Sequence, residues 1–366
     1  MMFLSSRSAR GVVTALATAC LLAHAPARAA EPQACPASAD GASFVCNVVN
    51  VEDLVSLPST HWLVGSSLHG AGSKTPPLYL FDSKTRKAQE VSAGDVKIAR
   101  DAKTYADCPG DPDLAKFSSH GLDYVSRGKR GTLYVVNHGG RESIEAFEVD
   151  VSSPKPTFTW KGCVVAPDGF WPDAVAALPG GGMVVTSLWD PKDSDRLSKL
   201  VSGKPVGALA EWYPKTGWKI IGPAGMSGPN GVVATPDGNS VFVALWSAGK
   251  VMRLDRKTGK ATTVDVDFRP DNLRWEAGNK SILLGGQTST VKEAIEDCFA
   301  KPLVNCNIPF KIVRLDPRTL QTQPLVDGRI YGNMGAGTGA LTVGKDLWVT
   351  TFRGDRLAIF EGRAQR

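Results

Sequence analysis

The sequence has no long run of acidic or basic residues, and its 366 residues carry a formal net charge of only +6. So small an excess of positive charge gives no reason to expect nucleic acid as a partner. Two motifs are also absent. There is no C-x-x-C pair, the spacing typical of thiolate metal sites, and no G-x-S-x-G, which presents a nucleophilic serine. Thiolate metal binding is therefore disfavoured, and a serine nucleophile is not expected.

Long apolar runs are absent except near the start of the chain. Arg7 and Arg10 precede an apolar run over 11–25, which is too short to span the roughly 30 Å hydrocarbon core of a bilayer. Small residues at Ala27 and Ala29 suit a cleavage site. These features predict a signal peptide over residues 1–29, cut after Ala29, and a secreted or periplasmic protein without a membrane span after cleavage. Residues 30–366 are expected to form a single domain, whose net charge falls from +6 to +3 because three arginines leave with the peptide.

Cysteine is sparse, but the six residues that follow the predicted signal peptide form an even set. In an exported chain such a set indicates disulfides. The sequence alone allows many pairings, although two pairs lie close together along the chain. That spacing suggests the following bonds: Cys35 with Cys46, Cys298 with Cys306 and, by remainder, Cys108 with Cys163.

Short strands in a repeating order are abundant, and Gly228 to Thr263 is the clearest copy of the repeat. It contains four short strands separated by turn residues such as Pro236-Asp237-Gly238. Its second strand has counterparts along the chain, which lie at 62–67, 132–138, 182–188, 240–246, 281–287 and 346–352. Six small sheets in a fixed order predict an all-β fold, a six-bladed β-propeller of four-stranded antiparallel blades.

The closure of the ring and two long insertions can also be predicted. The last blade ends at its third strand, 359–361, so the N-terminal segment Phe44 to Val51 is expected to supply the fourth strand and close the ring. Insertions in blades three and five cover Trp189 to Gly207 and Thr288 to Pro309, and both contain helix-like pieces. Both insertions leave from the face at which the first strands begin, so they are expected to form its walls.

Polar residues gather at that face, beside the central channel. They are Glu52, Asp53, Asp173, Asn230, Asp271 and Asn272, with His120, Asn137, His138 and Gln287 nearby. Carboxylate and amide oxygens favour Ca²⁺ over Mg²⁺, with another divalent metal as an alternative, whereas Zn²⁺ would be expected to draw His or Cys. Each residue alone has another interpretation, such as a turn residue for Asn230 or a structural histidine for His120. Their common position within the repeats favours a metal site.

Four segments carry a resemblance to a known family: VEDLVSLP at 51–58, SSHGLDYV at 118–125, LYVVNHGG at 133–140 and NGVVATPDGNSVFVA at 230–244. They resemble the matching segments of the paraoxonase/arylesterase lactonases, which belong to the gluconolactonase (SGL-type) superfamily of six-bladed propellers. The resemblance implies a catalytic calcium at Glu52, Asn230, Asp271 and Asn272. It implies a deeper structural calcium at Asp53, the Leu122 carbonyl and Asp173. It also implies that His120 and His138 activate water.

Two departures from that family are visible. Pro172 stands where the family has an Asn ligand of the catalytic ion, so one or two ions remain possible. No cysteine follows Cys306, so the disulfide that joins the chain ends in the family is missing, and Cys35 with Cys46 would fasten the N-terminal segment instead.

The expected function is an exported, calcium-dependent hydrolase of lactones or aryl esters, which are small-molecule substrates. His120, assisted by His138, would remove a proton from water, and Ca²⁺ would stabilise the oxyanion. A gluconolactonase-like sugar lactonase with one divalent ion is an alternative, which Pro172 favours and the histidine pair disfavours. Another is a calcium-stabilised propeller that binds a ligand or partner without turnover, because a fold does not fix a function.

Overall fold

The computed structural model describes residues 36, 38–69, 75–301 and 303–365. These residues belong to one compact unit, Cys35–Arg366. The predicted signal peptide, residues 1–29, lies outside the described residues, and so does Cys35. None of the helices in the described ranges is long and apolar enough to cross a membrane.

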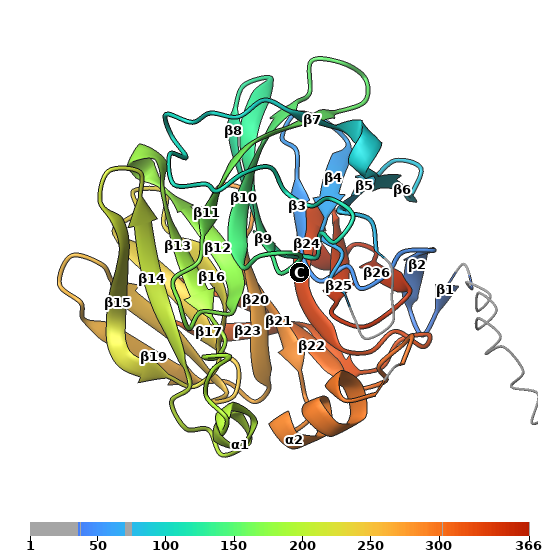
Figure 1. Ribbon diagram of the computed structural model, residues 1–366. Helices are drawn as coiled ribbons and strands as arrows, with labels where there is room; N and C mark the ends of the chain where they lie inside the picture. Colours follow the sequence, from blue (N-terminus) through green and yellow to red (C-terminus); the bar gives the residue numbers. More distant parts are fainter. Residues whose placement is uncertain (1–35, 37, 70–74, 302, 366) are drawn as a thin grey trace, which may run out of the picture. The chain divides into compact units, whose positions relative to one another are not determined.

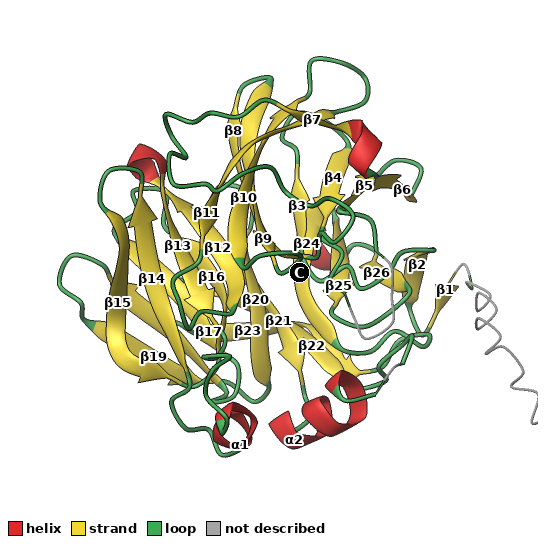
Figure 2. Ribbon diagram, in the orientation of Figure 1, coloured by secondary structure: helices red, strands yellow, loops and turns green. Residues whose placement is uncertain are grey.

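The strands form six sheets, each with a core of four antiparallel strands, and the sheets are arranged around a common axis (Figures 1 and 2). The first strand of each sheet is innermost and contacts the first strand of the next sheet. From the centre outward, the first three blades are β3 (Leu54–Ser56), β4 (Trp62–Gly65), β5 (Leu78–Asp82) and β6 (Lys87–Val91); β8 (Ser119–Arg127), β9 (Arg130–Asn137), β10 (Ser143–Asp150) and β11 (Thr157–Val165); and β12 (Pro172–Leu178), β13 (Gly182–Ser187), β14 (Gly207–Tyr213) and β15 (Gly217–Met226).

The other three blades follow in the same order. They are β16 (Pro229–Ala234), β17 (Ser240–Leu245), β18 (Lys250–Asp255) and β19 (Ala261–Asp265); β20 (Arg269–Trp275), β21 (Ile282–Gln287), β22 (Phe310–Leu315) and β23 (Thr322–Arg329); and β24 (Gly337–Val343), β25 (Asp346–Thr351), β26 (Arg356–Phe360) and β2 (Ala42–Cys46). Two short strands extend blades at their outer edges, β1 (Ser38–Ala39) beside β2 and β7 (Val96–Ile98) beside β11. Short 3-10 helices lie at η1 (Ala93–Asp95), η2 (Pro179–Gly181) and η4 (Arg363–Gln365). The predicted six-bladed propeller is confirmed.

The N-terminal strand closes the ring, as predicted. Strand β2 pairs with β26 in antiparallel register, with Phe44 opposite Ala358. The strand predicted at Phe44 to Val51 instead begins at Ala42 and ends at Cys46. It ends there because Asn47 and Asn50 adopt positive φ angles of 62° and 48°, which take the backbone out of the extended conformation.

The inner strands bury apolar residues on both faces, because successive strand residues point to opposite sides of a sheet and neighbouring blades cover both sides. At the closing junction, for example, Phe81 of β5 packs edge-on against Trp348 of β25, with ring centroids 6.3 Å apart. Two of the predicted disulfides are present, Cys108–Cys163 and Cys298–Cys306. Cys46 is also disulfide-bonded, but its predicted partner Cys35 lies outside the described residues.

The innermost strands share an irregularity at the predicted site. In β8, β12, β16 and β20 the pairing register shifts near the start of the strand, and each shift spans a predicted site residue. Strand β24 has a similar shift between Gly337 and Ala340. Such bulges re-aim side chains away from the regular ladder. At Gly231 a Cβ atom would lie 2.4 Å from the Asp271 carbonyl oxygen, so glycine lets β16 approach β20 at this level. Asn230 therefore lies in a bulged inner strand and not in a turn.

Both predicted insertions contain helices. The insertion in blade three carries α1 (Arg196–Val201), and the one in blade five carries α2 (Val291–Glu293), which continues as the π-helix η3 (Ala294–Phe299). The Thr290 side chain accepts a hydrogen bond from the Glu293 amide and so caps α2. Helices α1 and α2 contact each other at the mouth of the channel, where Figure 2 shows them close together.

Candidate functional site

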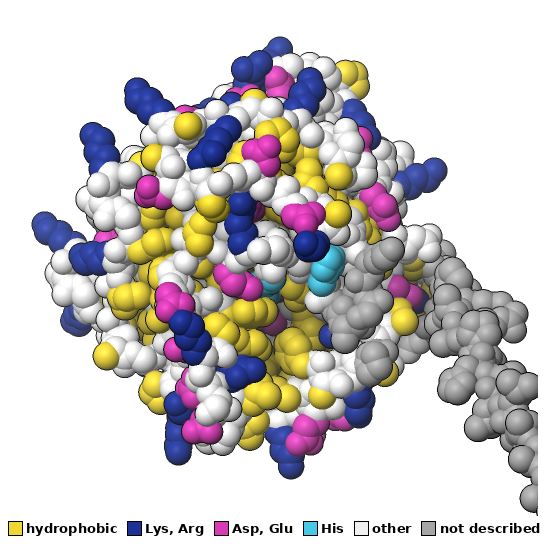
Figure 3. Space-filling model, viewed as in Figure 1, with side chains coloured by type: hydrophobic (Ala, Val, Ile, Leu, Met, Phe, Trp, Pro, Cys, Tyr) yellow, Lys and Arg dark blue, Asp and Glu magenta, His cyan; other side chains and the backbone are white. Residues whose placement is uncertain are grey.

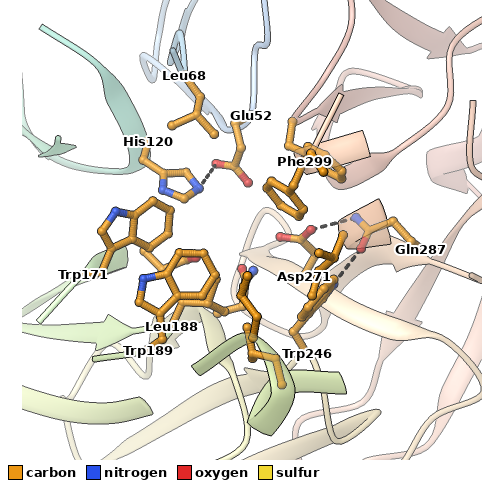
Figure 4. A pocket seen from close by; sticks show the side chains of 17 residues that line it. Glu52, Leu68, His120, Trp171, Leu188, Trp189, Trp246, Asp271, Gln287 and Phe299 are labelled. Carbon is orange, nitrogen blue, oxygen red and sulfur yellow. Dashed lines mark hydrogen bonds and ion pairs between the residues drawn. The ribbon is translucent and has the colours of Figure 1, made fainter. Parts of the chain in front are cut away.

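Four buried side-chain oxygens face one cavity and have no hydrogen-bond partner among the described residues. They are Glu52 Oε2, Asp173 Oδ1, Asn230 Oδ1 and Asp271 Oδ1. The cavity has a volume of about 220 Å³ and all four residues line it; Glu52 and Asp271 are labelled in Figure 4. An unpaired buried acceptor costs about 1–3 kcal/mol, and more when it is charged. Four such acceptors around one cavity would be satisfied by a bound cation.

The charges of the site support the same conclusion. Burial raises the pKa of Glu52 and of Asp173 well above their usual values, and the neighbouring Asp271 raises both further. Burial also raises the pKa of Asp271, to about 7. The three carboxylates thus oppose one another's ionisation, which a divalent cation among them would reverse.

The chemistry of these oxygens, and not their spacing, is what favours a hard cation. Within the described part of the chain, no three His, Cys, Asp or Glu side chains are spaced to hold a metal ion. Three carboxylates and an amide oxygen are hard ligands, which suit Ca²⁺ better than Zn²⁺.

Neighbouring residues hold two of these carboxylates in place. Gln287 donates to Asp271 Oδ2 at 2.7 Å and accepts a hydrogen bond from the Trp246 indole at 2.7 Å (Figure 4). Asn272 donates to Glu52 Oε1 at 2.5 Å and to the Glu52 carbonyl oxygen at 3.1 Å. Of the four predicted ligands of the catalytic ion, Glu52, Asn230 and Asp271 present free oxygens, whereas Asn272 orients Glu52.

The predicted histidine pair lies beside these oxygens. His120 Nδ1 is 3.0 Å from His138 Nε2, and His120 Nε2 is 3.6 Å from Glu52 Oε2. His138 Nδ1 in turn contacts Glu142 Oε2 at 2.6 Å. Burial, and secondly the neighbouring His138, hold the pKa of His120 well below its usual value. His120 is therefore neutral at neutral pH.

The contact with Glu142 sets the tautomers of both rings when the pair is neutral. A carboxylate only accepts, so a neutral His138 would carry its proton on Nδ1 and offer Nε2 as an acceptor. His120 would then carry its proton on Nδ1, which would leave its Nε2 unprotonated. Trp171 stacks on His138 at 4.2 Å and on Trp189 at 4.8 Å, which fixes the plane of the His138 ring.

The wall of the cavity is strongly apolar. Figure 3 shows hydrophobic side chains gathered in the hollow between α1 and η3. The apolar lining consists of Leu68, Trp171, Leu188, Trp189, Leu197, Leu200, Trp246, Ile295, Phe299, Ala300 and Phe352. The two insertions thus supply part of the wall, as their positions in the sequence predicted.

The residues predicted for a deeper ion are arranged differently. Asp53 and the Leu122 carbonyl meet at the guanidinium of Arg274, which donates to both Asp53 oxygens at 2.7 Å and to Leu122 O at 3.0 Å. Asp173 instead lines the cavity that contains the four unpaired oxygens, which we call the upper cavity. The residues present therefore do not fit a metal ion at the deeper position.

Sequence reasoning missed Arg274, Glu142 and the support from Trp246. A signal for Arg274 does exist, since it follows Asn272 by two residues in one strand and alternation puts both on one face. Glu142 lies four residues after His138, beyond the end of β9, where no strand period applies.

Comparisons with known proteins agree with this architecture. No family model matches the sequence, and no curated protein does. Among solved structures, the chain is similar to a predicted gluconolactonase, at 15% identity over 88% of this chain and 92% of that one, with a TM-score of 0.50. It is also similar to a gluconolactonase from Xanthomonas campestris, at 12% identity over 88% and 90% with a TM-score of 0.49, and to a luciferin-regenerating enzyme, at 11% over 86% and 92% with a TM-score of 0.49. The chain shares the six-bladed β-propeller fold, as the resemblance in its sequence implied.

Proposed function

We propose that the protein is a calcium-dependent hydrolase of apolar lactones and aryl esters. The observation that carries the proposal is the set of four unpaired oxygens, which lie beside a neutral histidine at the base of an apolar cavity. Glu52, Asp173, Asn230 and Asp271 would hold the ion. Bound there, Ca²⁺ would polarise the substrate carbonyl and stabilise the negative charge that develops on its oxygen.

The side chains of the site then perform the proton transfers. His120 Nε2 accepts a proton from water as the water oxygen bonds to the carbonyl carbon. His138 accepts a hydrogen bond from His120 Nδ1 and donates one to Glu142, so positive charge on the pair is stabilised. When the ester C–O bond breaks, the leaving oxygen takes the proton from His120 and the pair returns to its neutral state.

The cavity favours an apolar acyl or aryl group over a sugar. A sugar lactone carries several hydroxyl groups, each of which needs a hydrogen-bond partner when it is buried. The wall above the oxygens and His120 offers mainly aromatic rings and aliphatic side chains. Two disulfides also suit an exported protein, in agreement with the signal peptide predicted over residues 1–29.

A hydrolysis screen tests the proposal. We expect the purified protein to hydrolyse aryl esters and alkyl-substituted lactones, to lose this activity with a chelator, and to regain it with Ca²⁺. Burial of each methylene added to the lactone side chain contributes about 0.8 kcal/mol of transfer free energy. We therefore expect kcat/KM to rise about 4-fold per methylene until the cavity is full. Gluconolactone is the matched polar substrate. A preference for it would favour a sugar lactonase, and no hydrolysis of either class would favour a binding propeller.

Replacing Glu142 with glutamine should slow hydrolysis by about 10-fold to 100-fold, the range typical of residues that orient a catalytic or ligating histidine. Glutamine can present its NH₂ to His138 Nδ1, so the tautomers are no longer fixed. Loss of the carboxylate also destabilises positive charge on the histidine pair, so the acid limb of the pH profile for kcat/KM should move to lower pH. Glu361→Gln, at an exposed ion pair with Arg86, is the control. An unchanged pH profile would contradict this role.

A further inference from the structure

In the deeper part of the channel, Arg274 contacts two of the residues that the resemblance assigns to a second calcium, Asp53 and Leu122. Arg274 extends from β20, the strand that also supplies Asp271 and Asn272. Its Nη2 donates to both oxygens of Asp53 and to the Leu122 carbonyl, and its Nη1 lies 3.6 Å from Asp123 Oδ1. The Arg274 side chain is 16% exposed, and it also lines a separate cavity at the far end of the inner strands.

Asp53 has no acceptor capacity left for a metal ion. Besides Arg274, its Oδ1 accepts from the Leu54 amide and its Oδ2 accepts from the Leu122 amide, each at 2.8 Å. Calcium needs six to eight oxygens at about 2.3–2.6 Å, and it would have to displace a guanidinium that stays charged at every physiological pH. The two cations therefore exclude each other at this position.

Asp173 is the third residue of the implied deep set, and it does not join Arg274. Its Oδ1 is unpaired and its side chain lines the upper cavity with Glu52, Asn230 and Asp271. The residue before it is Pro172, which has no side-chain oxygen. The resemblance implies an Asn ligand at position 172, which Pro172 cannot replace. Asp173 supplies an oxygen to the upper cavity in its place.

We propose that Arg274 is a built-in cation that replaces a second calcium ion, so that this propeller holds one divalent ion and Asp173 is a ligand of that ion. Arg274 ties β20 to β8 and to the segment before β3 across the channel. The role of Arg274 does not rest on the proposed hydrolysis, because it concerns contacts below the cavity. The inner ring is held together without metal, and chelation removes activity but leaves the fold.

Counting bound calcium tests the proposal. Wild type, Arg274→Ala and Arg256→Ala would be dialysed against Ca²⁺, and the ions bound per chain measured by mass spectrometry. Arg256 is the matched control, because it forms a partly buried ion pair with Glu211 at the outer edge of the ring. We expect one ion in wild type and in Arg256→Ala, and two in Arg274→Ala. Thermal unfolding should depend on Ca²⁺ more steeply in Arg274→Ala than in wild type.

Two outcomes would overturn the proposal: two ions in wild type, or a folded Arg274→Ala protein with no additional ion. If Arg274→Ala does not fold even with Ca²⁺, the wild-type count decides, with one ion in support and two against. A wild type that binds no ion would overturn the part of the proposal that assigns one divalent ion to Asp173, and with it the proposed calcium-dependent function; one ion in Arg274→Ala would then support the role of Arg274 alone.

Discussion

Replacing His120 with glutamine should lower kcat/KM for an apolar lactone by about 10²–10⁴-fold, the contribution typical of a positioned general base. Glutamine is close to histidine in size and keeps a hydrogen-bonding group near His138. Its amide cannot accept a proton at neutral pH, so attacking water would no longer be activated. Initial rates at saturating Ca²⁺ measure this loss directly.

The metal should remain bound in the His120→Gln variant. His120 contributes no oxygen to the set of four, and its Nε2 lies 3.6 Å from one of them, Glu52 Oε2. We therefore expect the same number of bound calcium ions and a thermal midpoint close to that of wild type. His61→Gln is the control, because His61 is partly exposed and pairs with Asp82 at the edge of the first blade. Unchanged hydrolysis in His120→Gln would remove this histidine from the mechanism.

The fold was predictable because its information is repeated. Because one strand order occurs six times, strands that are unclear in one blade can be located by comparison with the others. The clearest copy, Gly228 to Thr263, served for this comparison. Residues at the start of each inner strand could be grouped on one face without knowing any distance. Asn230 shows the value of this grouping, because the close approach of β16 to β20 at Gly231, and not a turn, places it at the site.

The partners of the charged side chains in the channel could not be predicted in the same way. The resemblance assigns Asp53 to a metal ion, and nothing in the sequence shows that the guanidinium of Arg274 contacts it instead. A bulge in an inner strand also determines whether a carboxylate points into the cavity or toward Arg274. In β12 the bulge lies between Pro172 and Val175, and Asp173 lines the cavity. Glu142 reaches His138 through a loop, where no periodicity exists to predict the contact.

Replacing Asp271 with asparagine should weaken calcium binding by about 100-fold or more, beyond the range seen when only an outer-sphere partner is lost. The substitution keeps the volume of the side chain and removes its charge. Its amide nitrogen must also face either the ion or Gln287 Nε2, which now donates to Asp271 Oδ2 at 2.7 Å. Hydrolysis should be lost at low Ca²⁺ and partly restored at high Ca²⁺. Calcium titrations followed by calorimetry and by activity would measure both effects.

The same variant should be more stable than wild type when no metal is present. Next to burial, the charge of Asp271 is the main cause that raises the pKa of Glu52 and of Asp173, so in the metal-free site it opposes the ionisation of both. Removing about 1 kcal/mol of repulsion would raise the melting temperature by roughly 2–4 °C in a protein somewhat smaller than this one. Asp267→Asn, at an exposed ion pair with Lys311, should change neither property. Opposite shifts in metal affinity and metal-free stability are the signature of a ligand, whereas a purely structural Asp271 would lower stability both with and without calcium.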